Sequence, residues 1–192
     1  MLSKNWLLLS CLVVFISTLK GQNHALASCS IELTKQSVVY DPTYFSIDYP
    51  MGDVPSDRGV CSDVVIRAYR LLGVDLQQEV HEDMKSNFDL YPKIWDLSSC
   101  DTNIDHRRVP NLLTFFTRNA QSRVISQKAI DYKPGDLVIW QLPRGRMHIG
   151  IVSNVATLDK ARFMMVHNIG AGQLLEDCLF DYPIIGHFVY MP

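Results

Sequence analysis

Three side chains, taken in chain order, could form a thiol hydrolase site. Cys61 lies at the expected start of a helix, where unpaired N–H groups and the helix dipole favour a thiolate. His148 opens an apolar strand after a glycine-containing turn, and its imidazole can take the thiol proton and later return it to a leaving group. His167 and Asn168 close the next strand, and either could orient the His148 ring. The pattern predicts amide hydrolysis through a thioester intermediate.

Each of these residues also has an ordinary structural interpretation. Cys61 could be half of a disulfide or a small core residue, and a lone histidine such as His148 is commonly a surface or structural side chain. Because side chains alternate along a strand, only one of His167 and Asn168 can point into the same cleft. The hypothesis therefore depends on the combination of positions, and on a crevice that Cys61 and His148 share.

Apolar spacing predicts helices in the first half of the chain. After Cys61, apolar residues recur at three- and four-residue intervals until Gly73, which is a natural helix stop, so we expect a helix over residues 62–72. Further helices are expected at residues 76–86 and 110–119, after a first helix within 31–40. The connecting loops should lie at residues 41–57, with a short strand near 44–47, and at residues 91–108.

After Lys128 the pattern changes to short apolar runs between tight turns. We expect strands at residues 137–140, 148–152, 163–166 and 184–190. Helices followed by strands indicate an α+β fold, with a helical N-terminal half packed on an antiparallel β-sheet. Antiparallel pairing of 148–152 with the next strand would bring His167 back towards His148.

These motifs resemble those of the NlpC-type cell-wall peptidases, which have a papain-like fold. The pattern of that family is a helix-opening Cys, a turn of Pro-Gly-Asp type, a His that begins a strand and a polar residue that closes the next strand. The corresponding residues here are Cys61-Ser62-Asp63, Pro134-Gly135-Asp136-Leu137, His148-Ile149-Gly150-Ile151-Val152 and Val166-His167. The resemblance covers roughly residues 55–170 and implies that His167, rather than Asn168, is the third member. The long segment between Cys61 and His148 departs from the pattern.

The chain also resembles a YijF-like bacterial family, a domain of unknown function, over most of residues 40–190. The segments that carry this resemblance are 52–55, 59–70, 80–84, 103–112, 148–152 and 167–170. Because the family has no settled function, this resemblance bears on the fold more than on the substrate.

Two arginines in the loop before the third helix could bind substrate carboxylates. Arg107 and Arg108 offer the planar guanidinium groups that pair with carboxylates in a bidentate manner. They could equally form internal salt bridges to Asp101 or Asp105. We include Asp63 and Asn168 among the candidate binding residues; Asp63 is more suited to pairing with an arginine or capping the first helical turn than to acting as a base.

The N-terminus has the organisation of a secretory signal peptide. Lys4 precedes an apolar run over residues 6–19, which is shorter than the roughly 20 residues needed to span a bilayer, and Ala25-Leu26-Ala27 resembles a cleavage site. We therefore expect residues 1–27 to be a signal peptide and residues 28–192 to be a single domain. The alternatives are an uncleaved membrane anchor and a lipid anchor at Cys29.

Cysteine usage leaves the disulfide pairing open. Cys11 would leave with the leader, and four cysteines would remain in an oxidising compartment: Cys29, Cys61, Cys100 and Cys178. They could form two disulfides, but a catalytic Cys61 must stay free, which permits at most one. The chain has no CxxC pair, and His81-Glu82 lacks the second histidine of a zincin motif, so we expect no metal and no cofactor.

Composition excludes some functions and leaves others open. The 192 residues are 47% hydrophobic and 20% charged with a formal net charge of -2, which gives a normal core and no basic surface for nucleic acid. No second apolar run is long enough to cross a membrane. The expected signal peptide and the resemblance to the NlpC-type peptidases together imply a periplasmic or secreted cysteine peptidase or amidase that acts on peptidoglycan or another peptide. The alternatives are a non-catalytic cell-envelope binding module on the same scaffold and a cysteine-dependent acyltransferase or deamidase.

Overall fold

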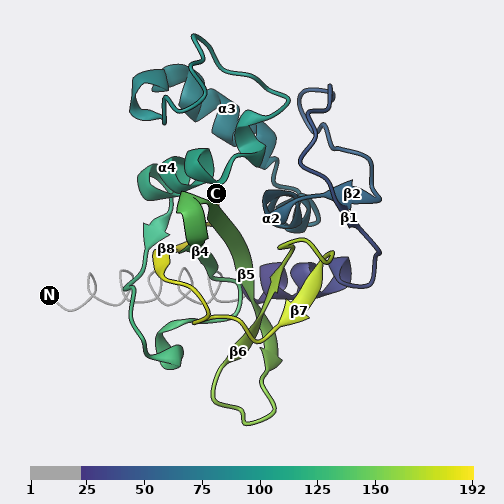
Figure 1. Ribbon diagram of the computed structural model, residues 1–192, viewed down its shortest axis with the longest axis vertical. Helices are drawn as coiled ribbons and strands as arrows, with labels where there is room; N and C mark the ends of the chain where they lie inside the picture. The colour runs from purple at the N-terminus through teal and green to yellow at the C-terminus, as the bar shows by residue number, and fades with distance from the viewer. Residues whose placement is uncertain (1–22) are drawn as a thin grey trace, which may run out of the picture.

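The computed structural model describes residues 23–192, in which three long helices precede most of the strands (Figure 1). The helices are α2 (Cys61–Arg70), α3 (Leu76–Ser86) and α4 (Val109–Asn119). A six-stranded sheet follows, formed by β3 (Gln121–Ser122), β4 (Leu137–Gln141), β5 (Met147–Ala156), β6 (Phe163–His167), β7 (Leu174–Glu176) and β8 (Ile184–Val189). The expected α+β class, with helices first and an antiparallel sheet afterwards, is confirmed.

The spatial order of the sheet is β3-β8-β4-β5-β6-β7, and every neighbouring pair is antiparallel. The predicted helices and strands are found with shifts of a few residues at their ends, and α3 has the predicted limits. β3 and β7 were not predicted, because each is too short to show an alternation of apolar and polar residues.

The segment before α2 differs from the prediction. A helix covers residues 23–33, earlier than the helix expected within 31–40, and no strand forms near residues 44–47. Instead β1 (Val39–Tyr40) pairs in parallel with β2 (Arg58–Gly59). Four single-turn 3-10 helices lie in the remaining connections: Phe88–Leu90, Asp105–Arg107, Ala129–Asp131 and Pro143–Gly145.

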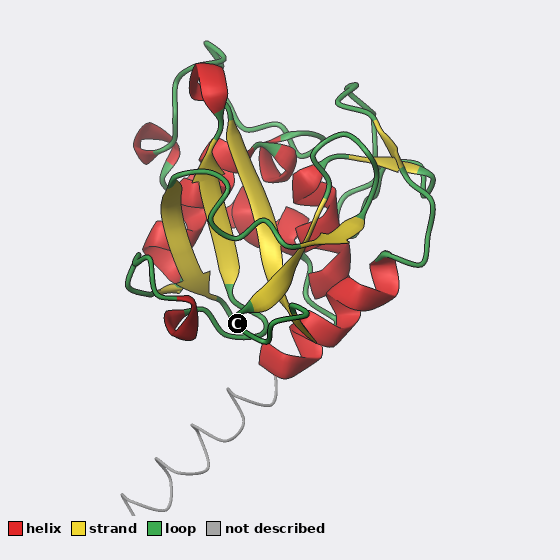
Figure 2. Cartoon of the chain, turned by 60° about the horizontal axis from the view of Figure 1, so that its bottom comes forward, coloured by secondary structure: helices red, strands yellow, loops and turns green. Residues whose placement is uncertain are grey.

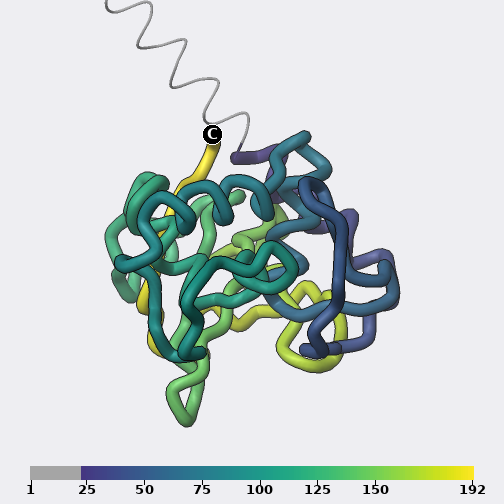
Figure 3. Tube along the Cα trace, turned by 90° about the horizontal axis from the view of Figure 1, so that it is seen from above, coloured from purple at the N-terminus to yellow at the C-terminus, as the bar shows by residue number. Residues whose placement is uncertain are grey.

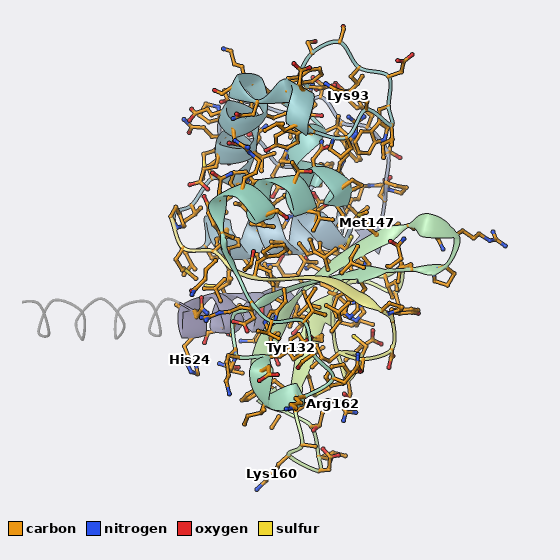
Figure 4. All side chains as sticks on the ribbon, turned by 90° about the vertical axis from the view of Figure 1, so that its left-hand side faces the viewer. His24, Lys93, Tyr132, Met147, Lys160 and Arg162 are labelled. Carbon is orange, nitrogen blue, oxygen red and sulfur yellow. The ribbon has the colours of Figure 1, made fainter. Side chains whose placement is uncertain are left out.

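The sheet separates two apolar clusters of unequal size. Its helix-covered face packs Leu137, Ile139, Ile149 and Ile151 against α2, α3 and α4. Alternate residues of β4, Val138 and Trp140, point to the other face, where they meet loop residues that include Tyr132. Figure 2 shows helices behind the sheet and loops in front of it, and Figure 4 shows Tyr132 on the side away from α2, α3 and α4.

The helix of residues 23–33 is part of this packing. Leu26 and Ala27 are fully buried, Leu26 within the large core, and the Asn23 amide approaches the Asp136 carboxylate at 3.4 Å. The boundary expected after residue 27 therefore falls inside a packed helix. The rest of the expected signal peptide, including Cys11, lies outside the described residues.

Segments distant in sequence meet around the start of α2. The Gln173 amide donates to the Leu33 carbonyl at 2.9 Å, and the Asn168 amide donates to the Gly59 carbonyl at 3.2 Å. Figure 3 shows the corresponding segments side by side, the dark-blue chain before α2 next to the yellow-green chain after β6. Within residues 23–192 no helix has the length and apolar character needed for crossing a membrane.

Candidate active site

Cys61 is the first residue of α2 and is nearly buried, with 6% of its surface exposed. The preceding residue, Val60, is the N-cap in an extended conformation, and the Asp63 carboxylate accepts its backbone N–H at 2.7 Å. A carboxylate at this position satisfies an unpaired helix N–H and is favoured by the helix dipole. The local sequence therefore begins the helix at the sulfur-bearing residue.

Three contacts from elsewhere in the chain hold this helix start in place. The Ser62 hydroxyl donates to the Arg107 carbonyl at 2.7 Å. The Asp63 carboxylate receives Nε and Nη2 of Arg107 at 2.9 and 3.0 Å, and both side chains are almost fully buried. Asn168 supplies the third contact through its bond to the Gly59 carbonyl. Bidentate pairing of this kind fixes orientation as well as distance.

The sheet brings His148 and His167 together as the antiparallel pairing predicted. Ile151 of β5 pairs with Val166 of β6, which returns the end of β6 to the start of β5. His148 Nε2 then lies 2.8 Å from His167 Nδ1. Both rings are buried, and they lie on the face of the sheet opposite to Ile149 and Ile151.

Trp140 forms one wall of this histidine pair. Its indole stacks on the His148 ring with centroids 5.5 Å apart and an interplanar angle of 25°, and its N–H is held by the Leu179 carbonyl at 2.9 Å. Burial, with a smaller contribution from His167, lowers the pKa of His148 to about 3. His148 is therefore neutral at physiological pH and is available as a proton acceptor.

Cys61 and His148 line the same crevice, which has a volume of about 230 Å³. The backbone N–H of Ile149, the residue after His148, lies near enough to the Cys61 sulfur to favour its thiolate form. Arg146, Ile169 and the aromatic ring of Tyr182 complete the walls. Met147, at the start of β5, is another lining residue and is labelled in Figure 4.

The sulfur is a neutral thiol in this environment. Burial raises the pKa of Cys61 to about 11, and the nearby Asp63 carboxylate adds to the effect. The backbone N–H groups of Ile149, Ser62 and Cys61 itself act in the opposite direction, because they stabilise a thiolate. Desolvation is the largest of these effects, so the resting pair is thiol and imidazole rather than thiolate and imidazolium.

A larger crevice of about 420 Å³ meets the first at Cys61. Tyr40 and Met147 line both crevices, whereas Arg108 lines only the larger one. The Arg108 guanidinium lies 4.1 Å above the Trp95 ring and uses Nη1 to reach Asp105 at 3.1 Å. This is the internal salt bridge to Asp105 considered above, and it leaves Nε and Nη2 of Arg108 without a described protein partner.

The four candidate binding residues thus have different surroundings. Asp63, Arg107 and Asn168 are buried and bonded to the protein itself. Arg107 additionally donates to the carbonyls of Thr43 and Asp41, at 3.1 and 3.4 Å. Arg107 also lines the larger crevice, but each of its guanidinium nitrogens is bonded to the protein, whereas Nε and Nη2 of Arg108 have no described protein partner.

Sequence reasoning missed three residues of this site: Tyr40, Trp140 and Glu176. Burial and the proximity of Cys61 raise the pKa of Tyr40, which keeps its phenol protonated in both crevices. Glu176 of β7 lies 2.8 Å from His167 Nε2. Trp140 could have been found from the register of two predicted strands, since it pairs directly with His148. Glu176 could not have been found in this way, because β7 is too short to be predicted from apolar spacing.

The four cysteines of the described chain are free: Cys29, Cys61, Cys100 and Cys178. Cys178 lies close to the histidine pair, with its sulfur 3.3 Å from His167 Nε2. Within residues 23–192 no three histidine, cysteine or acidic side chains gather into a cluster that could hold a metal ion.

Fold and site together define a class: an α+β domain in which a helix-opening cysteine faces paired strand-end histidines across a crevice. The chain belongs to the family described as domain of unknown function DUF1287, whose sequence pattern matches residues 27–190. It is 49% identical over 168 residues to a protein of Escherichia coli strain K12 described as uncharacterized protein YijF. That alignment covers 88% of this chain and 82% of the relative. No solved structure matches the fold significantly.

Proposed function

We propose that the protein is a cysteine hydrolase that cleaves an amide bond, with Cys61 as nucleophile, His148 as base and His167 as the residue that orients the base. The observation that carries the proposal is the crevice lined by both Cys61 and His148. This arrangement is similar to that of the NlpC-type peptidases, and the papain-like relationship belongs to the same proposal.

Attack begins from a neutral pair. The Cys61 S–H bond breaks as its proton passes to His148, and the sulfur forms a bond to the substrate carbonyl. The imidazolium then gives the proton to the leaving amine, and water hydrolyses the thioester with His148 as base again. Because burial raises the pKa of the thiol and lowers that of the imidazole, we expect proton transfer to accompany attack rather than precede it.

The backbone provides the most direct stabilisation of the developing negative charge. The backbone N–H groups of Cys61, Ser62 and Ile149 already favour negative charge at the sulfur. N–H groups at a helix start are suited to an oxyanion, because they are preorganised and partly desolvated. Tyr40 lines the same crevice, and its hydroxyl can donate a further hydrogen bond to the substrate.

The larger crevice supports a peptide substrate that carries a carboxylate. Arg108 offers unused guanidinium donors there, and Tyr44 and Ile104 supply aromatic and apolar walls. Peptidoglycan stem peptides carry several carboxylates, and the expected signal peptide would deliver the protein to the compartment that contains them. We therefore propose stem peptides as the substrate and a periplasmic or secreted location, with lipid attachment at Cys29 as the alternative.

Digestion of purified peptidoglycan with the wild type and Cys61→Ala, read by mass spectrometry, tests this function. We expect new muropeptides from the wild type alone, and the loss of a catalytic nucleophile should lower the rate by a factor on the order of 10³ or more. Lys93→Ala, a change at an exposed residue outside both crevices, is the control. Identical profiles from wild type and Cys61→Ala would remove the proposed substrate.

Two other functions make different predictions in the same experiment. A non-catalytic cell-envelope binding module would retain its affinity for peptidoglycan in Cys61→Ala and release no fragments. A cysteine-dependent acyltransferase or deamidase would change the mass of the peptide without hydrolysing the peptide bond. The buried, free thiol beside a neutral imidazole favours the hydrolase over the binding module.

A further inference from the structure

His167 has two competing partners on the side of its ring away from His148. Its Nε2 lies 2.8 Å from Glu176 Oε2 and 3.3 Å from Cys178 Sγ. Both partners come from the chain around β7, which the pairing of Met165 with Glu176 holds beside β6. His167 is buried, whereas the Glu176 side chain is 45% exposed.

The two partners impose opposite proton positions on the histidine pair. A carboxylate only accepts, so Glu176 requires a proton on His167 Nε2 and leaves its Nδ1 as an acceptor. His148 must then donate from Nε2 across the 2.8 Å contact, and its own Nδ1 is unprotonated. If the Cys178 thiol donated to His167 Nε2 instead, the proton of His167 would be on Nδ1 and would be donated to His148 Nε2. The proton of His148 would then be on Nδ1.

We infer that Glu176 is a positioning residue that sets the tautomers of both histidines and so makes His148 Nδ1 the nitrogen that accepts the Cys61 proton. Its part in catalysis rests on the function proposed above. In the step itself the Cys61 S–H bond breaks and a bond from Nδ1 to hydrogen forms. The His148 imidazolium keeps its Nε2 proton and continues to donate it to His167 Nδ1. His167 in turn donates from Nε2 to the Glu176 carboxylate.

The competing thiol explains why a carboxylate matters at this position. Burial raises the pKa of Cys178 to about 12, helped by Asp181, so this side chain is a protonated potential donor at neutral pH. Without Glu176, the Cys178 S–H becomes the nearest described partner of His167 Nε2. The tautomer that results has no free nitrogen at His148 with which to take the thiol proton.

Long-range proton–nitrogen NMR on histidine-labelled protein tests the inference without a substrate. In the wild type at neutral pH we expect both His148 and His167 to carry their proton on Nε2. Glu176→Ala should move the His148 proton to Nδ1 in most molecules. The double variant Glu176→Ala/Cys178→Ala removes both partners and should give a mixture of tautomers.

Two variants serve as controls. Asp177→Asn removes a neighbouring carboxylate that pairs with Arg162 at 2.6 Å, and Cys178→Ala removes only the competing thiol. Both should keep the wild-type tautomers, and all variants should keep the wild-type circular dichroism. A wild type with the His148 proton on Nδ1, or tautomers that are unchanged in Glu176→Ala, overturns the inference.

If Glu176 sets the tautomers, its loss should change how the alkylation rate of Cys61 depends on pH, which a merely structural role would not do. Alkylation of Cys61 in Glu176→Ala should slow at neutral pH by a factor on the order of 10–100 and recover as the thiol ionises at high pH. The two proposals fail separately. If Glu176→Ala changes the tautomers but Cys61→Ala leaves peptidoglycan digestion unchanged, only the hydrolase proposal is wrong. If the wild type cleaves peptides but Glu176→Ala leaves the tautomers unchanged, only the role of Glu176 is wrong.

Discussion

At the scale of single residues, the site combines groups that the protein keeps neutral. Burial raises the pKa of Cys61 to about 11 and lowers that of His148 to about 3. A neutral pair avoids two unsolvated charges, whose burial is expensive unless they are well paired. The site therefore differs from a preformed thiolate–imidazolium pair, and its reactivity should depend on transfer of the proton during attack.

Thiol alkylation compared among the four cysteines checks this description. Cys61 is more buried than Cys29 and Cys100, so exposure alone would make it one of the slower thiols. We expect Cys61 to react fastest near neutral pH, and His148→Gln to slow it by a factor on the order of 10²–10⁴, because general-base assistance is lost. Mass spectrometry of peptides after short exposure to iodoacetamide measures all four rates at once, with Cys29 and Cys100 as internal controls. Equal Cys61 rates in wild type and His148→Gln would contradict the assignment of the base.

At the scale of elements, the start of α2 is fixed by parts of the chain far from it in sequence. Arg107, which is 44 residues after Asp63, closes the buried ion pair, and Asn168 reaches back 109 residues to Gly59. These contacts explain why three of the four candidate binding residues are inside the protein. Asp63, Arg107 and Asn168 therefore position the Cys61 segment, and contact of Arg108 with a substrate carboxylate is part of the proposed function.

The helix of residues 23–33 contributes an apolar side chain to the core at Leu26. We expect Leu26→Ala to lower the free energy of unfolding by about 2–5 kcal/mol, as for other fully buried leucines. A chain that begins at residue 28 should likewise be less stable than one that begins at residue 23. Urea denaturation measures both effects, and Glu32→Ala on the exposed side of the same helix is the control. Equal stability of the two chains would mean that residues 23–27 add nothing to the folded domain.

At the scale of the whole molecule, buried neutral histidines make the fold sensitive to acid. Burial is the main cause that lowers the pKa of His106 and of His148 to about 3, with Arg107 and His167 as the next contributors. The unfolded value is about 6.5, so the folded state binds fewer protons between these limits. Stability from this source is fully present above about pH 6.5 and is lost as the pH falls towards about 3, by about 1.4 kcal/mol per pH unit and histidine.

Urea denaturation at about pH 7.5 and about pH 5 should therefore show a marked loss of stability at the lower pH. In His106→Gln the fall in the free energy of unfolding between the two pH values should be smaller, because one of the two histidines that cause it is gone. This holds even if the variant has a different stability at the higher pH. His24→Gln, at an exposed position, provides the matched control for removing an imidazole. A pH dependence that is the same in His106→Gln as in the wild type would contradict the assignment.

Local patterns in the sequence predicted the elements and the order of the reactive residues. The limits of α3 and the cores of β4, β5, β6 and β8 follow from apolar spacing and turn residues, which act over a few positions. The same spacing placed Cys61 at a helix start and His148 and His167 at neighbouring strand ends. The fold class and the order of the reactive residues therefore follow from local patterns, whereas the choice of His167 over Asn168 came from the resemblance to the NlpC-type peptidases.

The surroundings of these residues follow from the packing of distant parts of the chain. The Asp63–Arg107 ion pair, the stacking of Trp140 on His148 and the approach of Glu176 and Cys178 to His167 all join residues from different elements. Strand register and helix packing set such contacts, and neither leaves a periodic trace in the residues themselves. For the same reason the pKa values of Cys61 and His148 depend on burial that only the assembled fold creates.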